Sequence, residues 1–234
     1  MKIIFITFGG PSEKFHSAVD RICNEAKSFN VFDEVIGYTE QDLKNDSEFW
    51  KKHEEFITTH SKGYGYWIWK SYINFKTIER LDEGDIVVYA DAGCELRIQY
   101  INRMREYFDI LKNSEKGILG ITLGFNERHW TKMDAFHQLD CGEFVDDGYQ
   151  VVATACIYKK CSNTVSIMEK WYQHSCNYHL ITDEQSVSNN AHDFIEHRHD
   201  QSIFSLLVKK HGFEKIGYEI EELQPVPIYA ARRF

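Results

Sequence analysis

The amino-acid sequence predicts one α/β domain in which helices flank a central mixed, mostly parallel sheet. Three observations predict this fold. The chain opens with an apolar run at 3–8, an amphipathic stretch and a second apolar run at 34–38, the β-α-β pattern of a parallel sheet. The segment 85–89 holds three apolar residues in a row, as a central strand does. No internal repeat or low-complexity linker divides the 234 residues.

Strands and helices alternate through the first part of the chain. The run 3–8 ends at a Gly-Gly-Pro turn, and apolar residues then recur at helical spacing up to Phe29, with Ser12 placed to cap the helix. The run 34–38 predicts a second strand, and the polar stretch 40–62 predicts a loop with a short helix. This alternation favours parallel strands, because a parallel connection needs a crossover.

The segment 63–80 is aromatic at its start and helical afterwards. A helix that begins near Gly65 places Trp67, Lys70 and Asn74 on one face. An aromatic platform beside a lysine suits a nucleotide base and its phosphate, although an aromatic stripe at helical spacing is also typical of a core. We expect one face of this helix to be core and Lys70 to face a cleft.

The second half continues with less regular periodicity. Residues 124–149 and 177–199 are polar and carry weak patterns, so we expect irregular structure there. The elements expected around them are a strand at 85–89, a helix from residue 100, strands at 117–122 and 151–158, a helix around 165–172 and a short helix at 202–210.

The charge balance excludes several classes of partner. With 27 basic and 36 acidic side chains, the formal net charge is −9. Proteins that bind nucleic acid or anionic membrane surfaces present a basic face, so we expect neither partner. An anionic small molecule is still compatible with this charge where a local cation or a metal meets it.

Two further features concern the compartment. The apolar runs are a handful of residues long, whereas a membrane span needs about 20, so we expect no transmembrane segment and no secretory leader. The six cysteines are scattered without a C-x-x-C, which is typical of free thiols in a reducing compartment. We therefore expect a cytoplasmic protein, and the oligomeric state stays open.

Asp91 is the first candidate functional residue. It follows the expected central strand, and α/β sheets bind ligands at the carboxyl ends of their strands. One carboxylate with ligand phosphates and waters suffices for an ion such as Mg²⁺, and Gly93 would allow a ligand close to the backbone. The alternative is that Asp91 only caps a turn.

The segment 192–202 is rich in acid–base side chains just before an expected helix. Asp200 and His199 would then lie at a positive helix N-terminus, which suits an anion or an ionised carboxylate. A zinc site with His197, His199 and Asp200 is an alternative, but structural zinc prefers four ligands and no cysteine is near. Simple helix capping is a second alternative.

The loop Thr7-Phe8-Gly9 follows the first strand, where doubly wound folds contact nucleotides. It does not match G-x-G-x-x-G. The chain also contains no P-loop, G-x-S-x-G or H-E-x-x-H pattern. The sequence therefore predicts neither a dinucleotide enzyme of the usual kind nor a P-loop enzyme.

Four segments together carry a family resemblance. They are IIFITFGG at 3–10, KGYGYWIWKSYI at 62–73, GDIVVYADAGCE at 84–95 and FIEHRHDQSIFSLLVKKHG at 194–212. In this order and spacing the chain resembles small GT-A type glycosyltransferases of bacterial polysaccharide clusters and large DNA viruses. The resemblance implies one Rossmann-like GT-A domain over 1–234, with a nucleotide-binding half at 1–95 and an acceptor-binding half at 96–234.

The resemblance also implies a chemistry: transfer from a nucleotide-diphosphate sugar, UDP-sugar favoured, to a glycan or other hydroxyl acceptor, with Mn²⁺ or Mg²⁺. The Asp-x-Asp metal motif of such folds is matched by Asp91 alone, so Glu95 or a histidine would have to complete the coordination. The implied donor-binding residues are Thr7, Phe8, Gly9, Lys62, Trp67, Lys70, Ala90, Asp91, Ala92 and Gly93.

The implied catalytic residues are Asp200, Gln201 and His199. Asp200 or His199 could deprotonate the acceptor or orient sugar hydroxyls. Gln201 is uncharged and can lie near the anomeric carbon. Inverting and retaining outcomes both stay open.

Two other functions compete with this one. A sugar nucleotidyltransferase would carry a Gly- and basic-rich loop after the first strand, which residues 7–13 lack. A non-catalytic carbohydrate-binding protein on a degenerate GT-A fold would explain the reduced Asp-x-Asp.

Overall fold

The computed structural model describes residues 1–146, 148–217, 220 and 225–234, and in these ranges seven strands form one sheet. The strands are β1 (Ile3–Gly9), β2 (Glu34–Thr39), β3 (Ile86–Ala90), β5 (Ile118–Asn126), β6 (Tyr149–Val151), β7 (Ala155–Lys159) and β8 (Glu214–Gly217). Their order is β2-β1-β3-β7-β5-β6, and β8 also pairs with β5. A two-stranded sheet joins β4 (Glu95–Leu96) to β9 (Ile228–Tyr229).

The sheet is mixed and mostly parallel, as predicted. β1 runs parallel to β2 and β3, and β5 runs parallel to β8. β7 is antiparallel to both β3 and β5, and β6 is antiparallel to β5. Five strands therefore point one way, and β6 and β7 point the other way.

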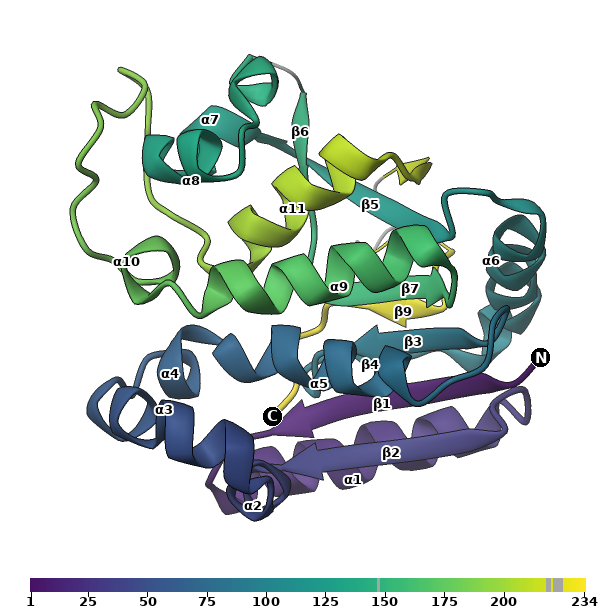
Figure 1. Cartoon of the computed structure of the whole chain (residues 1–234). Helices are drawn as coiled ribbons and strands as arrows, with labels where there is room; N and C mark the ends of the chain where they lie inside the picture. The colour runs from purple at the N-terminus through teal and green to yellow at the C-terminus, as the bar shows by residue number, and fades with distance from the viewer. Residues whose placement is uncertain (147, 218–219, 221–224) are drawn as a thin grey trace.

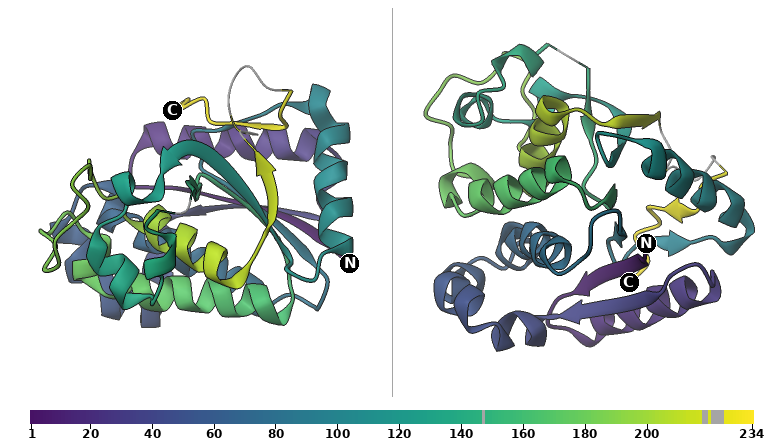
Figure 2. Two further views of the ribbon diagram at one scale, coloured as in Figure 1. Left: turned by 90° about the horizontal axis from the view of Figure 1, so that it is seen from above. Right: turned by 45° about the vertical axis from the view of Figure 1, so that its right-hand side comes forward.

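The helices lie on both faces of this sheet (Figures 1 and 2). The longer ones are α1 (Glu13–Ser28), α3 (Ser47–Thr59), α5 (Ile68–Glu79), α6 (Ile101–Asn113), α9 (Ser162–Ser175) and α11 (Asp200–His211). The shorter ones are α2 (Glu40–Asn45), α4 (Gly63–Tyr66), α7 (Glu127–Trp130), α8 (Met133–Gln138) and α10 (Tyr178–Ile181). Within the described ranges, none of these helices is both long and apolar enough to cross a membrane.

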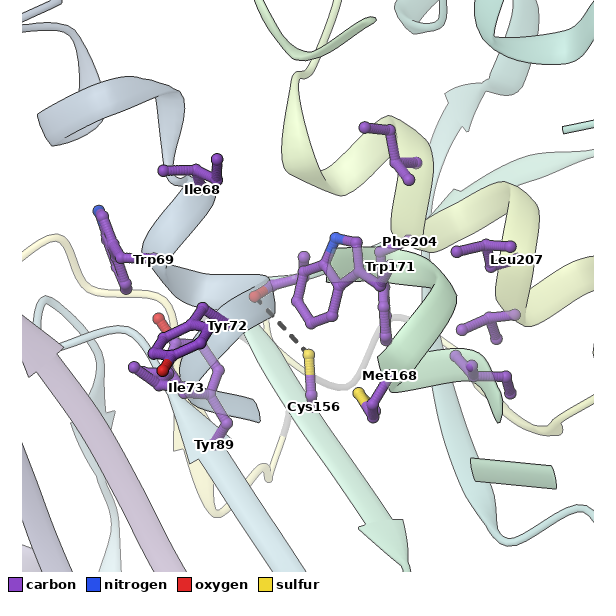
Figure 3. Close-up of a cluster of buried hydrophobic side chains, with 14 of the residues drawn as sticks. Ile68, Trp69, Tyr72, Ile73, Tyr89, Cys156, Met168, Trp171, Phe204 and Leu207 are labelled. Atoms are coloured by element: carbon purple, nitrogen blue, oxygen red, sulfur yellow. Dashed lines mark hydrogen bonds between the residues drawn. The ribbon is translucent and has the colours of Figure 1, made fainter. Parts of the chain in front are cut away.

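Alternation along the strands explains the two helix layers. In β3, Ile86 and Val88 pack with α1 and α6 on one face, whereas Val87 and Tyr89 pack with α3, α5, α9 and α11 on the other. Every residue of β3 is buried, as expected for a central strand. Figure 3 shows the cluster on this second face, in which Trp171 of α9 packs against Phe204 of α11.

Four sequence expectations were wrong in detail. The segments expected to be irregular contain the helices α7, α8 and α10. Residues 40–59 form two helices, because Thr39 and Asp46 each cap one. The helix expected from Gly65 begins at Ile68, because residues 63–67 have positive φ angles and cannot continue a right-handed helix. The strand expected at 151–158 is broken between β6 and β7, where residues 152–154 turn backbone groups toward the site described below.

Candidate active site

A pocket of about 450 Å³ opens at the carboxyl ends of β1 and β3. The chain leaves β1 toward β2 on one side, and β3 lies on the other side, which is the switch point where α/β sheets bind ligands. The pocket is lined by Phe8, Gly10, Pro11, Phe15, Ser61, Gly63, Tyr64, Trp67, Trp69, Asp91, Ala92 and Phe234.

The walls of the pocket are aromatic. Phe8 stacks on Trp69 with ring centroids 4.0 Å apart. Phe15 meets Phe234 edge-on at 5.3 Å. A flat apolar ligand such as a nucleobase finds stacking partners here, and the polar Asp91 lies in the same lining.

A left-handed turn builds one wall. Residues 63–67 all have positive φ, between 50° and 81°, a conformation that costs about 1–2 kcal/mol for each non-glycine residue. Gly65 is required here, because an added Cβ would lie 2.7 Å from Ile57. Trp69 Nε1–H donates to the Gly63 carbonyl at 2.9 Å and fixes the turn. Such strain is characteristic of functional segments.

Lys70 lies in the first turn of α5, beneath the pocket. Its side chain is 5% exposed, and Nζ lies 3.0 Å from Asp91 Oδ1 and 3.5 Å from Asp200 Oδ2. Nζ also donates to the Ala153 carbonyl at 3.3 Å. Burial opposes the positive charge, but the two carboxylates outweigh it and raise the pKa of Lys70 above its usual range. Lys70 is therefore a fixed cation.

One oxygen of the Asp91 carboxylate contacts Tyr89 and Lys70, and the side chain is partly exposed to the pocket. Tyr89 donates its hydroxyl hydrogen to Asp91 Oδ1, the same oxygen that Lys70 approaches. Burial, reinforced by the Asp91 charge, raises the pKa of Tyr89 well above its usual value, so the phenol stays protonated. The Asp91 side chain is 33% exposed and lines the pocket. Its second oxygen is thus the one that a ligand meets.

Asp200 begins α11 and faces Lys70 from the opposite side. Oδ2 is buried and has no hydrogen-bond partner among the described residues. Burial raises the pKa of Asp200 to about 6, although Lys70 opposes this shift. A buried, incompletely satisfied carboxylate next to a pocket is typical of a functional group.

Gln201 is positioned by a polar network. Its Oε1 accepts from the Ala153 N–H at 3.2 Å, and its Nε2 donates to Gln150 Oε1 at 2.9 Å. Gln150 is buried and donates in turn to Glu127 Oε1 at 3.2 Å. Glu127 is fully buried and pairs with Lys209 at 2.8 Å. The network fixes both the Gln201 amide and the break between β6 and β7.

His199 is buried behind Trp67, which lines the pocket. Its ring is stacked near that of Trp67 at 5.4 Å, and Nδ1–H donates to the Ile181 carbonyl at 2.9 Å. Burial lowers the pKa of His199 to about 4, so it is neutral at pH 7. Asp183, 3.6 Å from His199 Nε2, is held by Lys62 at 2.8 Å. His199 and Lys62 therefore both contact Asp183, which belongs to the second half of the chain.

Other residues expected to bind the donor support the pocket instead of lining it. Thr7 donates its hydroxyl hydrogen to the Ala90 carbonyl at 2.8 Å, and both residues are fully buried. An added Cβ at Gly9 would lie 2.7 Å from the Phe15 carbonyl oxygen, so this glycine allows α1 to approach β1. Of the expected set, Phe8, Trp67, Asp91 and Ala92 line the pocket.

The sequence interpretation missed several lining residues. Tyr64 and Trp69 belong to the aromatic segment that it singled out, so their role there could have been predicted. Phe234 could not, because nothing near it in the sequence relates it to Asp91.

The alternative that His197, His199 and Asp200 bind zinc is wrong for His197. Both of its ring nitrogens are already used, because Nδ1 accepts from the Lys132 N–H and Nε2 donates to the Leu180 carbonyl.

Comparison with known proteins gives matches in structure only. No protein-family model and no curated protein sequence matches the chain. Mouse xyloside xylosyltransferase 1 in its apo form matches with a TM-score of 0.51 and 11% identity, over 93% of this chain and 85% of that one. The chain has the GT-A fold.

Two further solved structures are similar at lower scores. A glycosyltransferase involved in the glycosylation of the major capsid of PBCV-1 has a TM-score of 0.46 and 10% identity, over 93% of this chain and 81% of that one. Galactosyltransferase LgtC in complex with donor and acceptor sugar analogs has a TM-score of 0.47 and 14% identity, over 94% and 74%.

The GT-A resemblance implies an Asp-x-Asp metal centre, and the residues present do not supply the second acidic side chain of that motif. If Asp91 is the second aspartate, the first is Tyr89, a buried phenol. If Asp91 is the first, the second is Gly93, where an added Cβ would lie 2.8 Å from the Phe234 ring. Glu95 is paired with Arg233 at 3.1 Å. Within the described ranges, no three His, Cys, Asp or Glu side chains gather as a cation site.

Proposed function

We propose that the protein is a glycosyltransferase that moves a sugar from a nucleoside diphosphate sugar, a UDP-sugar in particular, to a hydroxyl of a glycan acceptor. The observation that carries this proposal is the buried cation Lys70, held between Asp91 and Asp200 at the floor of an aromatic pocket in a GT-A fold. The aromatic pocket could stack on the base, the Lys70 ammonium would attract the diphosphate, and the carboxylates would accept hydrogen bonds from the sugar hydroxyls.

The two halves of the chain would bind different substrates, the first half the nucleotide and the second half the acceptor. Residues 1–95 supply most of the pocket that would hold the nucleotide. Residues 96–234 supply Asp200 and Gln201, and we assign the polar sequence segments 124–149 and 177–196 to the acceptor. The transferred sugar would lie where these halves meet, at Lys70.

The reaction breaks the bond from the anomeric carbon to the diphosphate oxygen, and the electron pair leaves with that oxygen. The acceptor oxygen forms the new bond to the anomeric carbon, and its proton passes to a carboxylate of the site or to the departing diphosphate. Lys70 stabilises the charge that grows on the leaving diphosphate, and such electrostatic stabilisation usually lowers the barrier more than any other effect. Asp200 takes the acceptor proton or orients sugar hydroxyls, and the neutral Gln201 amide borders the anomeric carbon.

The test is calorimetric titration of UDP- and GDP-linked sugars into the protein, with Asp91→Ala and Asp109→Ala as matched variants. Asp109 is exposed on α6 and does not line the pocket. We expect micromolar binding of one donor, a loss of about tenfold or more in Asp91→Ala, and no change in Asp109→Ala. Failure of every nucleotide sugar to bind would contradict the proposal.

A second candidate function rests on one observation, the single carboxylate at the metal-motif position. A non-catalytic carbohydrate-binding protein on this fold would bind sugar without transfer. In that case sugar binding would persist in Asp91→Ala, and no nucleotide would be released from any donor.

A further inference from the structure

We propose that this site carries its positive charge on the protein, with Lys70 and Arg232 taking the place of a divalent cation, so that the diphosphate binds without metal. The inference rests on the proposed function and adds the means by which the donor is held. Three observations carry it: the packing of residues 231–234 on Gly93, the oxygen atoms around the Lys70 ammonium, and the position of Arg232 next to Gly93.

The first observation is that residues 231–234 pack on Gly93, the position that a second acidic ligand would occupy, and that the Phe234 ring fills the space of its side chain. Arg233 N–H donates to the Gly93 carbonyl at 2.8 Å. An added Cβ at Gly93 would lie 2.8 Å from Phe234 Cζ and 3.4 Å from Arg232 Cα. An aspartate at this position would have to displace the Phe234 ring. Arg21 fixes residues 231–234 further, because its guanidinium donates to the carbonyls of both Ala92, at 2.7 Å, and Arg233, at 3.1 Å.

The second observation is that the Lys70 ammonium is surrounded by oxygens as a bound cation is. Asp91 Oδ1, the Ala153 carbonyl and Asp200 Oδ2 lie 3.0, 3.3 and 3.5 Å from Nζ. The Asp200 oxygen is buried and has no other partner in the described part of the chain. Two acidic side chains from distant segments thus converge on an ammonium, and a divalent ion between them would be repelled by it.

The third observation is a second cation next to Gly93, where the Arg232 Cα lies 3.4 Å from an added Cβ. Arg232 is exposed among the residues that pack on Gly93, and within the described ranges it makes no ion pair or hydrogen bond. Lys70 and Arg232 together bring two positive charges, as many as a divalent ion does. Lysine meets phosphate as a point charge, and arginine meets it through paired N–H groups. A diphosphate that rests between them needs no metal to offset its charge.

The wild-type protein provides the first test. UDP is titrated calorimetrically in 1 mM EDTA and again in 5 mM MnCl2, and MnCl2 alone is titrated in a third run. We expect the two UDP affinities to agree within about threefold and Mn²⁺ alone to show no site. UDP affinity that rises tenfold or more with Mn²⁺ would overturn the inference and leave the proposed function standing. No binding of UDP, GDP or their sugars under either condition would instead remove the proposed function.

Matched variants provide the second test. Lys70→Met should weaken UDP binding in EDTA about 100-fold, and Arg232→Gln about tenfold, as expected for lost charged hydrogen bonds. Lys76→Met is the control, because Lys76 lies on the same helix but is exposed and paired with Glu79. Wild-type UDP affinity in Lys70→Met would overturn the inference. Should that variant fail to fold, Lys70→Arg, which keeps the charge, should retain metal-independent binding.

Discussion

Two buried lysines, Lys70 and Lys132, have opposite environments. Lys70 is 4% exposed and faces two carboxylates, which raise its pKa. Lys132 is 1% exposed, and among the described residues Nζ donates only to backbone carbonyls, those of His179, of Thr182 at 3.2 Å and of Glu184 at 3.4 Å. Burial lowers the pKa of Lys132, and the charges of Asp134, Glu184 and Asp183 offset this shift only in part.

The difference teaches that burial alone does not mark a functional cation. Lys132 ties together the turn that follows α10, and its own N–H is accepted by His197. It is a cross-link between loops. Lys70, in contrast, holds two acids from distant parts of the chain at the floor of an open pocket. The two lysines therefore differ in the groups that they contact, and not in how deeply they are buried.

The largest effect is expected for Lys70→Met on transfer. Removing the cation should lower kcat/KM about 1000-fold, the size seen when a charge-stabilising donor is lost. Steady-state rates of nucleotide release, with circular dichroism to check folding, measure it. Lys70→Arg should recover part of the rate. A Lys70→Met enzyme within tenfold of the wild type would erase the distinction between the two lysines.

Lys132→Met should act on stability and not on the nucleotide. The change leaves three carbonyls without their charged donor, so the free energy of unfolding should fall by about 2–4 kcal/mol. Urea denaturation gives this value, and UDP affinity in the folded variant should stay within about threefold. If instead the affinity fell as far as in Lys70→Met, Lys132 would belong to the site.

Acid should affect the Lys70 site through Asp200. The folded pKa of Asp200 is raised to about 6, so the carboxylate is ionised above pH 6 and protonated below it. We expect kcat/KM to rise about tenfold per pH unit up to pH 6 and then to level off. The same raised pKa means that this group's contribution to stability declines as pH rises from about 4 to 6. In Asp200→Asn the ascending limb should vanish.

The smallest effect is expected at the pocket wall. Phe234 is 54% exposed and supplies one aromatic edge, so Phe234→Ala should weaken UDP about fivefold, near the low end of base stacking. Fluorescence of the pocket tryptophans, titrated with UDP, reports the affinity. Phe125→Ala is the control, because Phe125 is exposed on β5 and does not line the pocket. Equal losses in both variants would contradict this assignment.

The sequence predicted the parts of the site that follow from local pattern. Asp91 follows a buried strand, which the sequence marks by the end of an apolar run. Asp200 begins a helix, which the sequence marks by the start of apolar residues at helical spacing. Lys70 stands in a helix whose aromatic neighbours were already notable. For these residues the fold needed only to bring the element ends together, as a parallel sheet does.

The rest depends on contacts that no local pattern encodes. The left-handed turn at 63–67 opposes ordinary propensity and is fixed by tertiary contacts such as Trp69 to the Gly63 carbonyl. The break at 152–154 exists because Ala153 and Thr154 bond to Lys70 and Asp91. The docking of Phe234 against Gly93 joins segments about 140 residues apart, which sequence spacing cannot relate.

The most direct test of the central claim is the release of nucleoside diphosphate from UDP- and GDP-linked sugars, measured side by side for the wild type, Lys70→Met and Lys132→Met. We predict release from one donor by the wild type and by folded Lys132→Met, and release lowered about 1000-fold in Lys70→Met. No release by the wild type from any donor, or equal release by all three proteins, would contradict the account.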